Sequence, residues 1–238
     1  SSDYKTITKV AGAWSTGGTL NTARGLMGAA GTQTAGLGFG GNTAPVTANS
    51  EEYDGSAWAE GDNLNGARSQ LGGAGTQTAA VGFSGTPSPL AADSEEYNGS
   101  SWTEGNDMNT GRRNGAEAGT QTAAMAITGG SPDVANVEHY NGTSWSEGAD
   151  VNTARFVLPG CGTNTAAIIA GGDPNVASTE SYDGSSWTEV SDLNTGRSDC
   201  GMAGSSDAAS FFGGSVGGTR QTANEFWDGA AWTEVADI

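Results

Sequence analysis

Short stretches of the chain alternate between apolar and small residues with a period of two. The clearest pairs on one face are Leu37 with Phe39, Val81 with Phe83, and Met125 with Ile127, and a fifth stretch keeps only Phe212, with Ser210 in the other place. Alternation of this kind is typical of a half-buried strand. A run of Gly and Ala precedes each stretch, and Asp-Gly or Asn-Gly pairs follow, which are turn signals. The pattern therefore predicts an all-β chain.

The stretches belong to a repeat with a period of 42 to 45 residues. Its markers are a Trp, an Arg ten residues later, and a Gly seven residues after that Arg. The Trp column is Trp58, Trp102, Trp145, Trp187 and Trp232, and the Arg column is Arg24, Arg68, Arg112, Arg155 and Arg197. A turn-rich repeat of this length is typical of β-propeller blades. We expect one domain, 1–238, with five four-stranded antiparallel blades at 21–64, 65–108, 109–151, 152–193 and 194–238.

The third predicted strand of each repeat carries a Glu two residues before an aromatic residue, which places both on one face. The Glu column is Glu51, Glu95, Glu138, Glu180 and Glu225. Directly after the aromatic residue comes an Asp-Gly or Asn-Gly pair, as at 54–55 and 98–99. Such pairs are typical of a type I′ hairpin, in which both central residues have positive φ. We expect this turn to lead into an outermost strand that carries the Trp.

These columns resemble the kelch repeat from residue 20 to 238. The Arg, the small-residue strand, the apolar strand ending in Gly, the Tyr and the Trp follow in kelch order, with a double Gly at 40–41, 129–130, 171–172 and 213–214 and Ser-Gly at 84–85. The resemblance implies a propeller that binds partners through one face. Near-identical copies of Gly-Thr-Gln-Thr-Ala are also similar to repeats in uncharacterised marine phage open reading frames of the virion or tail type. That likeness implies a virion or extracellular location.

The N-terminal residues bear on how the ring closes. Trp14 lies ten residues before Arg24, so 1–20 matches an outermost strand, although Trp232 supplies an outermost strand as well. Because a propeller is stabilised by closing its ring, we expect 1–20 to be a closing strand at the seam between the first and fifth blades. A partial sixth blade is the alternative.

Charge narrows the possible partners. The chain has 9 Lys and Arg against 27 Asp and Glu, for a net charge of −18. Proteins that bind nucleic acid or anionic membranes need clustered basic residues, so we expect this acidic chain to bind no nucleic acid. No apolar run is long enough for a membrane span, so we expect no membrane insertion.

Residues that could support catalysis or bind metal are few. His139 is the only His, and it occupies a column, shared with Glu52 and Glu96, that we interpret as exposed. Cys161 and Cys200 are interpreted as small core residues without a disulfide. One His and two Cys make no ligand set for zinc or copper, and kelch-fold copper oxidases resembling galactose oxidase need two His and a Tyr–Cys cofactor. We expect no catalytic residue, no cofactor and no transition metal.

The Arg and Glu columns have two interpretations. Sialidases on a propeller fold bind carboxylates with Arg. One Arg and one Glu per blade, however, is the count that a repeated structural ion pair requires, since a lone buried charge would be costly. We interpret both columns, and the Trp column, as structural.

Two sets of loops are candidates for binding, and both are expected on one face. The first set, between the second and third strands, varies while the rest of the repeat is constant, which is typical of binding loops although unconstrained loops also vary. Its distinctive residues are Pro87, Pro89, Leu90, Asp173, Arg220 and Gln221. The second set carries recurring Glu, Asp and Asn, which form turns and are also the oxygen ligands of calcium. The opposite face has Gly-Thr-Gln-Thr turns that we expect to be too short for a pocket.

Three functions are compatible with these features. The first is a non-enzymatic interaction module, on a virion or tail, that presents its loops to a host glycan or protein. The second is a purely structural spacer without a ligand. The third is a carboxylate-dependent glycoside hydrolase at the channel mouth, which the regularity of the repeats disfavours because an active site breaks symmetry. The first is our leading hypothesis.

Overall fold

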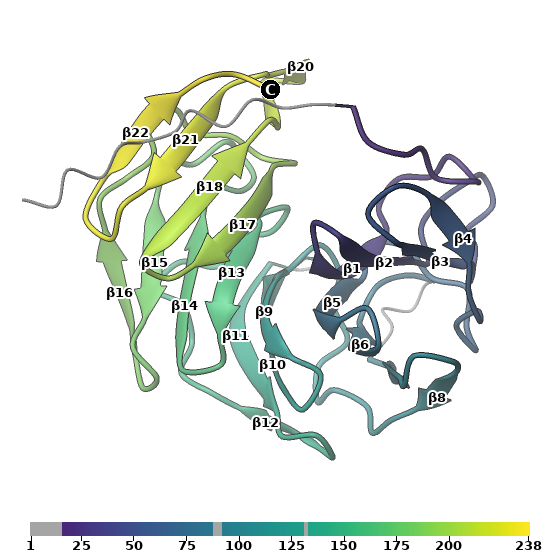
Figure 1. The fold of residues 1–238 in the computed structure, drawn as a ribbon. Coiled ribbons are helices and arrows are strands. Elements are labelled where there is room, and N and C mark those ends of the chain that lie inside the picture. The colour runs from purple at the N-terminus through teal and green to yellow at the C-terminus, as the bar shows by residue number, and fades with distance from the viewer. Residues whose placement is uncertain (1–15, 88–91, 131–132) are drawn as a thin grey trace, which may run out of the picture.

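The structure, a computed structural model, describes residues 16–87, 92–130 and 133–238. Within these ranges it contains strands and no helix, arranged as five four-stranded antiparallel sheets and one two-stranded hairpin. The five sheets stand as blades around a central axis (Figure 1). The predicted all-β, five-bladed propeller is therefore confirmed. The described residues include no helix that could cross a membrane.

Each blade runs from its innermost to its outermost strand in sequence order. The innermost strands are β1 (Gly28–Thr32), β5 (Gly72–Thr76), β9 (Ala116–Thr120), β13 (Gly160–Thr163) and β17 (Gly201–Ser205). The second strands are β2 (Ala35–Phe39), β6 (Ala79–Phe83), β10 (Ala123–Gly129), β14 (Ala166–Ala170) and β18 (Ala208–Phe212). The third are β3 (Ser50–Tyr53), β7 (Ser94–Tyr97), β11 (Val134–Tyr140), β15 (Thr179–Tyr182) and β21 (Asn224–Trp227). The outermost, β4 (Trp58–Glu60), β8 (Trp102–Glu104), β12 (Trp145–Glu147), β16 (Trp187–Val190) and β22 (Trp232–Val235), all begin at the repeated Trp.

The turn before each outermost strand is a hairpin, but it is not of type I′. In the first blade the loop comprises 54–57, and within it only Gly55 has a positive φ, of 93°. The Asp54 carboxylate accepts hydrogen bonds from the N–H groups of Ser56 and Ala57, both at 2.8 Å. The hairpin prediction was right and the turn type wrong, because the Asp side chain holds a four-residue loop that needs positive φ only at Gly.

One buried ion pair joins the Arg and Glu columns in every blade, as predicted. The distances are 2.8 Å for Arg24–Glu51, 2.7 Å for Arg68–Glu95, 2.9 Å for Arg155–Glu180 and 3.1 Å for Arg197–Glu225, and Arg112 pairs in the same way with Glu138. None of these side chains is more than 3% exposed.

The same carboxylate holds the loop that leads into the blade. In the second blade Asn65 donates to Glu95 Oε2 from its backbone N–H at 2.7 Å and from its side-chain amide at 2.9 Å. The corresponding pairs are Asn109 with Glu138, Asn152 with Glu180 and Asn194 with Glu225. Each Glu therefore fixes its Arg and its incoming loop to the third strand.

Apolar clusters join neighbouring blades at four interfaces. Phe39 and Trp102 belong to the cluster between the first and second blades, and three further clusters join the second to the third, the third to the fourth and the fourth to the fifth. Large and small residues face each other across these interfaces, since a Cβ on Gly82 would lie 2.8 Å from the Phe39 ring. Between the fourth and fifth blades the large and small residues change places. Ala170 has the repeat position of Phe39, Phe211 has that of Gly82, and both belong to the cluster at this interface.

The fifth interface, between the last blade and the first, is not formed like the others. N–H groups link Gln70 to the Leu26 carbonyl, Asn114 to Gln70, Val157 to Asn114 and Asp199 to Val157, at 2.7 to 3.4 Å around the axis. Among the described residues the bond that would complete the circle, from Leu26 N–H to the Asp199 carbonyl, is absent, and no apolar cluster joins these two blades. Figure 1 shows the corresponding opening between β17 and β1. The expectation of a closed ring is therefore wrong for this part of the chain.

The closing-strand prediction for 1–20 falls largely outside the described residues. Only 16–20 are described, and they lie beside the first blade: a Cβ on Gly17 would be 3.5 Å from the Tyr53 hydroxyl oxygen. Whether 1–15 close the ring stays a prediction.

Arg112→Ala should lower the free energy of unfolding by about 3 to 5 kcal/mol, because it leaves the Glu138 carboxylate buried without its cation. The matched control is Arg113→Ala, since Arg113 is half-buried and makes no ion pair among the described residues. Its loss should change stability by about 0.5 kcal/mol or less. Urea unfolding of both variants checks this, and equal effects would show that the buried pair is not special.

Candidate functional site

The connections between second and third strands lie on one face, which we call the loop face. Where they are described, they differ in structure. In the third blade β10 and β11 reach Gly129 and Val134, so the connection is short, whereas in the fifth blade it forms an extra hairpin of β19 (Ser215–Val216) and β20 (Thr219–Arg220). The blades that carry these connections share one strand order and one ion pair. The loop face is thus where the repeats differ.

The predicted binding residues are spread over three blades of this face. Pro87, Asp173 and Arg220 are exposed, whereas Gln221 is half-buried and its amide donates to the Thr219 carbonyl at 2.9 Å. Among the described residues no hydrogen bond or ion pair brings the four together. Pro89 and Leu90 lie outside the described residues.

A ring of five residues at the centre of the loop face was missed by the sequence reasoning. Leu26, Gln70, Asn114, Val157 and Asp199 stand two residues after each repeat Arg, and all have positive φ, between 53° and 59°. They line a cavity of about 290 Å³ at the mouth of the central channel. Five different residue types at one position of a close repeat were the available signal. Leu26 is the most accessible apolar member, at 51% exposed.

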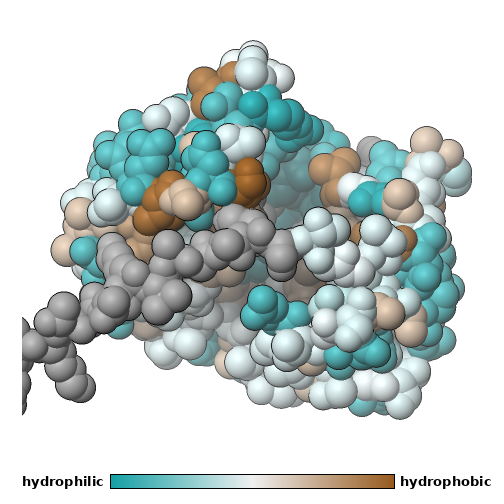
Figure 2. All heavy atoms as spheres, turned by 45° about the horizontal axis from the view of Figure 1, so that its top comes forward, coloured by the Kyte–Doolittle hydropathy of each residue, from teal (hydrophilic) through white to brown (hydrophobic). Residues whose placement is uncertain are grey.

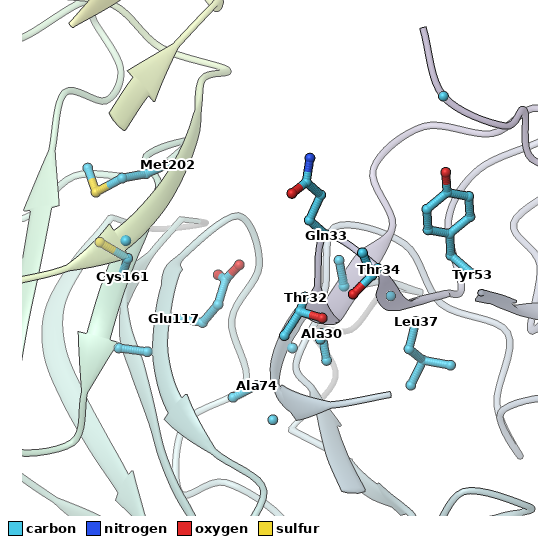
Figure 3. Close-up of a pocket in the computed structure, with 18 of the residues that line it drawn as sticks. Ala30, Thr32, Gln33, Thr34, Leu37, Tyr53, Ala74, Glu117, Cys161 and Met202 are labelled. Atoms are coloured by element: carbon cyan, nitrogen blue, oxygen red, sulfur yellow. The ribbon is translucent and has the colours of Figure 1, made fainter. Parts of the chain in front are cut away.

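Glu117 lies deeper in the channel and borders both of its cavities. It stands on β9, five residues after Arg112, where the other repeats have Ala29, Gly73, Gly160 and Met202. Its carboxyl group points into the cavity (Figure 3). Desolvation raises the pKa of this carboxyl group to about 8, although its side chain is only half-buried at the border of the cavity.

The larger cavity opens on the opposite face, which corrects the expectation that the short turns there could form no pocket. Its volume is about 980 Å³, and it extends from the channel over the face of the first blade, along Gln33, Leu37, Tyr53 and Trp58. Figure 2 shows the molecular surface hollowed between largely hydrophilic rims, and Figure 3 shows Glu117 and Met202 across the space from Gln33. The cavity exists because the fifth interface is open, a feature that turn length does not reveal.

The Asn members of the calcium candidate set are occupied by structural contacts. The recurring Asn side chains bind the buried Glu column, as Asn65 binds Glu95. Among the described residues no three His, Cys, Asp or Glu side chains gather where a metal ion could bind.

The column of His139 is not exposed, contrary to expectation. Its other members, Glu52 and Glu96, accept hydrogen bonds from Tyr hydroxyl groups of the following blade, so the column faces an interface. The His139 ring is half-buried, with its centroid 5.7 Å from that of Tyr182, and burial lowers the His139 pKa.

The two cysteines are free thiols in the cluster between the fourth and fifth blades. Cys161 is buried and Cys200 half-buried, and burial raises the pKa of the Cys200 thiol to about 11. Both positions agree with the predicted packing role.

Comparison with known proteins adds no relative. No family model matches the chain, and no curated protein matches it.

Glu117→Gln should make the protein more stable than wild type at high pH. The folded state holds a proton up to a pKa of about 8, whereas the unfolded carboxyl releases it near 4.5. Wild-type stability therefore falls as pH rises through this window, and the Gln variant lacks this fall. Urea unfolding at pH 4, 6 and 9 should show an advantage of the variant that grows with pH. The exposed control Glu147→Gln should show none, and equal pH profiles for all three proteins would contradict the assignment.

Proposed function

We propose that the chain is a non-enzymatic binding module that recognises a protein surface through its loop face. The main support is that the five blades share one strand order and one ion pair, whereas the connections described on this face differ in structure. Variable loops on a rigid scaffold are the usual arrangement of binding sites. The stability of the blades depends on contacts elsewhere, so the loops are free to differ.

The exposed groups of the loop face favour a protein over a glycan. Sugar recognition commonly uses exposed aromatic rings, and among the described residues the only exposed large hydrophobics are the aliphatic Leu26 and Ile238. Arg220 extends from a hairpin tip formed by Gly217 and Gly218, both exposed. An isolated Arg beside small residues and an exposed Leu are groups that anchor protein interfaces. The net charge of −18 favours a ligand that is neutral or basic rather than nucleic acid or an anionic membrane.

The repeat type and location form a finer part of this proposal. The order of Arg, double Gly, Glu with its aromatic neighbour, and Trp supports a kelch-type repeat. The likeness of the repeats to phage sequences supports a virion or tail component, whose ligand would be a host surface protein.

Arg220→Ala should weaken ligand binding at least tenfold, because a hot-spot Arg contributes several times more than its neighbours. Labelled chain is first applied to a cell-surface protein array and to a glycan array, and the protein hits are titrated with the variant. The control Thr188→Ala, exposed on the outer strand β16, should leave affinity unchanged.

Two results would contradict the proposal. Binding to glycans alone would replace the ligand class while leaving the face in place. Binding that is insensitive to Arg220→Ala and lost on Thr188→Ala would show that the outer strands, not the loops, carry the contact.

A further inference from the structure

Side chains bond across the formed blade interfaces in a recurring way. The Gln77 amide donates to the carbonyl oxygens of Gly36 and Tyr53 in the preceding blade, at 3.1 and 2.8 Å, and Gln121 repeats this one blade further on. Indole N–H groups donate to hydroxyl groups of the preceding blade, in the pairs Trp102–Ser50, Trp145–Ser94 and Trp232–Thr179. One or both kinds of bond join three of the four formed interfaces. Between the third and fourth blades, the apolar cluster forms the interface, and the Trp187 indole N–H has no partner among the described residues.

The first blade presents the same donors on its open side. We call this open interface the seam: Gln33, Gly38 and Trp58 of the first blade, with Gly214 and Asn224 of the fifth. Gln33 has the repeat position of Gln77, and its side chain is exposed and makes no hydrogen bond among the described residues. Trp58 is half-buried where its counterparts are buried, and within the described ranges its indole N–H finds no acceptor.

The fifth blade presents the matching acceptor side. The side-chain oxygen of Asn224 is buried and accepts no hydrogen bond from any described residue, although Ser50 and Thr179 at this repeat position each accept one from a Trp. Ile238 has the position of Leu193 but is 46% exposed where Leu193 is 4%. A buried acceptor without a partner is unfavourable, so this surface favours a neighbour that donates to it.

The neighbour that fits is a further blade rather than the first blade itself. The fifth blade already has four strands, yet Trp14 has the same spacing to the next Arg as every outer-strand Trp. The described residues after Trp14 follow the same course as in the next repeat. A Cβ built on Gly17 would lie 3.5 Å from the Tyr53 hydroxyl oxygen, and one built on Gly61 would lie 3.6 Å from that of Tyr97. The chain thus enters the first blade along the path that elsewhere leads from the outer strand of a preceding blade.

We propose that the seam is a docking site for the three inner strands of one more repeat of this kind, carried by a separate polypeptide segment. The docked strands continue the four established interfaces. Their carbonyl groups accept the Gln33 amide, a hydroxyl at the Ser50 position accepts the Trp58 indole N–H, and an apolar ring fills the space above Gly38, where the Met27 side chain now lies. This site is separate from the loop face and does not depend on the proposed ligand.

The probe is a synthetic peptide of residues 65–99, which carries the three inner strands of the second repeat without its Trp strand. Calorimetric titration of the full chain should give saturable one-to-one binding, and the peptide should raise the thermal midpoint. The matched variants are Gln33→Ala at the seam and Gln77→Ala in a formed interface. Gln33→Ala should weaken peptide binding about tenfold, because two hydrogen bonds are lost, without lowering the midpoint. Gln77→Ala should lower the midpoint and leave the affinity unchanged.

A fused chain guards against a peptide that fails to fold alone. Residues 65–99 are joined directly after Ile238, which has the repeat position of Leu64, and the fusion should raise the thermal midpoint and bury Trp58. No peptide binding together with an unchanged midpoint of the fusion would overturn the proposal. Equal loss of affinity in both Gln variants would place the peptide elsewhere, and concentration-dependent dimers of the chain alone would make a second copy the occupant.

Discussion

The buried Glu carboxylate of the third strand is the contact on which each blade depends. One oxygen of Glu95 binds the guanidinium group of Arg68, and the other binds the backbone and side-chain N–H groups of Asn65. Four strands with small apolar surfaces would be marginal alone, and this carboxylate fixes the incoming loop, the channel-side strand and the outer half of the blade together. A buried ion pair is costly unless its remaining groups are bonded. The Asn65 donors meet that condition for the Glu95 carboxylate, whereas the Arg68 Nε–H group is buried without a hydrogen-bond partner among the described residues. Because the ion pair and the bond from the backbone N–H of the Asn to the Glu carboxylate recur in every blade, the loop face can vary without loss of the blade structure.

Contacts between blades have a direction, and that explains both the ring and its opening. The second and third blades each give a Gln amide and a Trp indole to the blade before them, and the fifth blade gives its Trp indole to the fourth. A chain of such units has two unlike ends, which satisfy each other only if the ring closes at the natural angle or if further strands lie between them. Gln33 is exposed at one end, and at the other end the buried oxygen of Asn224 has no hydrogen-bond partner in the described part of the chain. These are the two sides of one unformed interface.

The repeats made the architecture predictable from the sequence, and the features that could not be predicted are those in which one repeat differs from the others. The spacing of Trp, Arg and Gly was enough to place all five blades, and the equal number of Arg and Glu identified the ion pairs. The hairpin type was not predictable from Asp-Gly alone, since Asp54 closes the loop with its side chain. Ser210 stands where the other second strands have an apolar residue. Phe211, on the other face of that strand, packs in one cluster with Ala170 of the fourth blade instead. Comparing the same position in each repeat does not show this, because the contact joins different positions of two repeats. Glu117 was overlooked because its position is otherwise filled by small residues and Met, and only the structure shows that it borders both channel cavities.

Disulfide trapping across the open interface tests the central claim, that this chain forms four blade interfaces and leaves the fifth for another segment. In a background without the native cysteines, one variant carries Leu26→Cys with Asp199→Cys, and its control carries Gln70→Cys with Asn114→Cys, a pair joined by a backbone hydrogen bond of 3.1 Å. Adjacent residues of that kind are within reach of a disulfide, whereas residues across an opening are not. Under mild oxidation the account predicts that the control pair crosslinks within the monomer and the Leu26–Asp199 pair stays reduced. Equal intramolecular crosslinking of both pairs would show that the ring closes on itself, and would contradict the account.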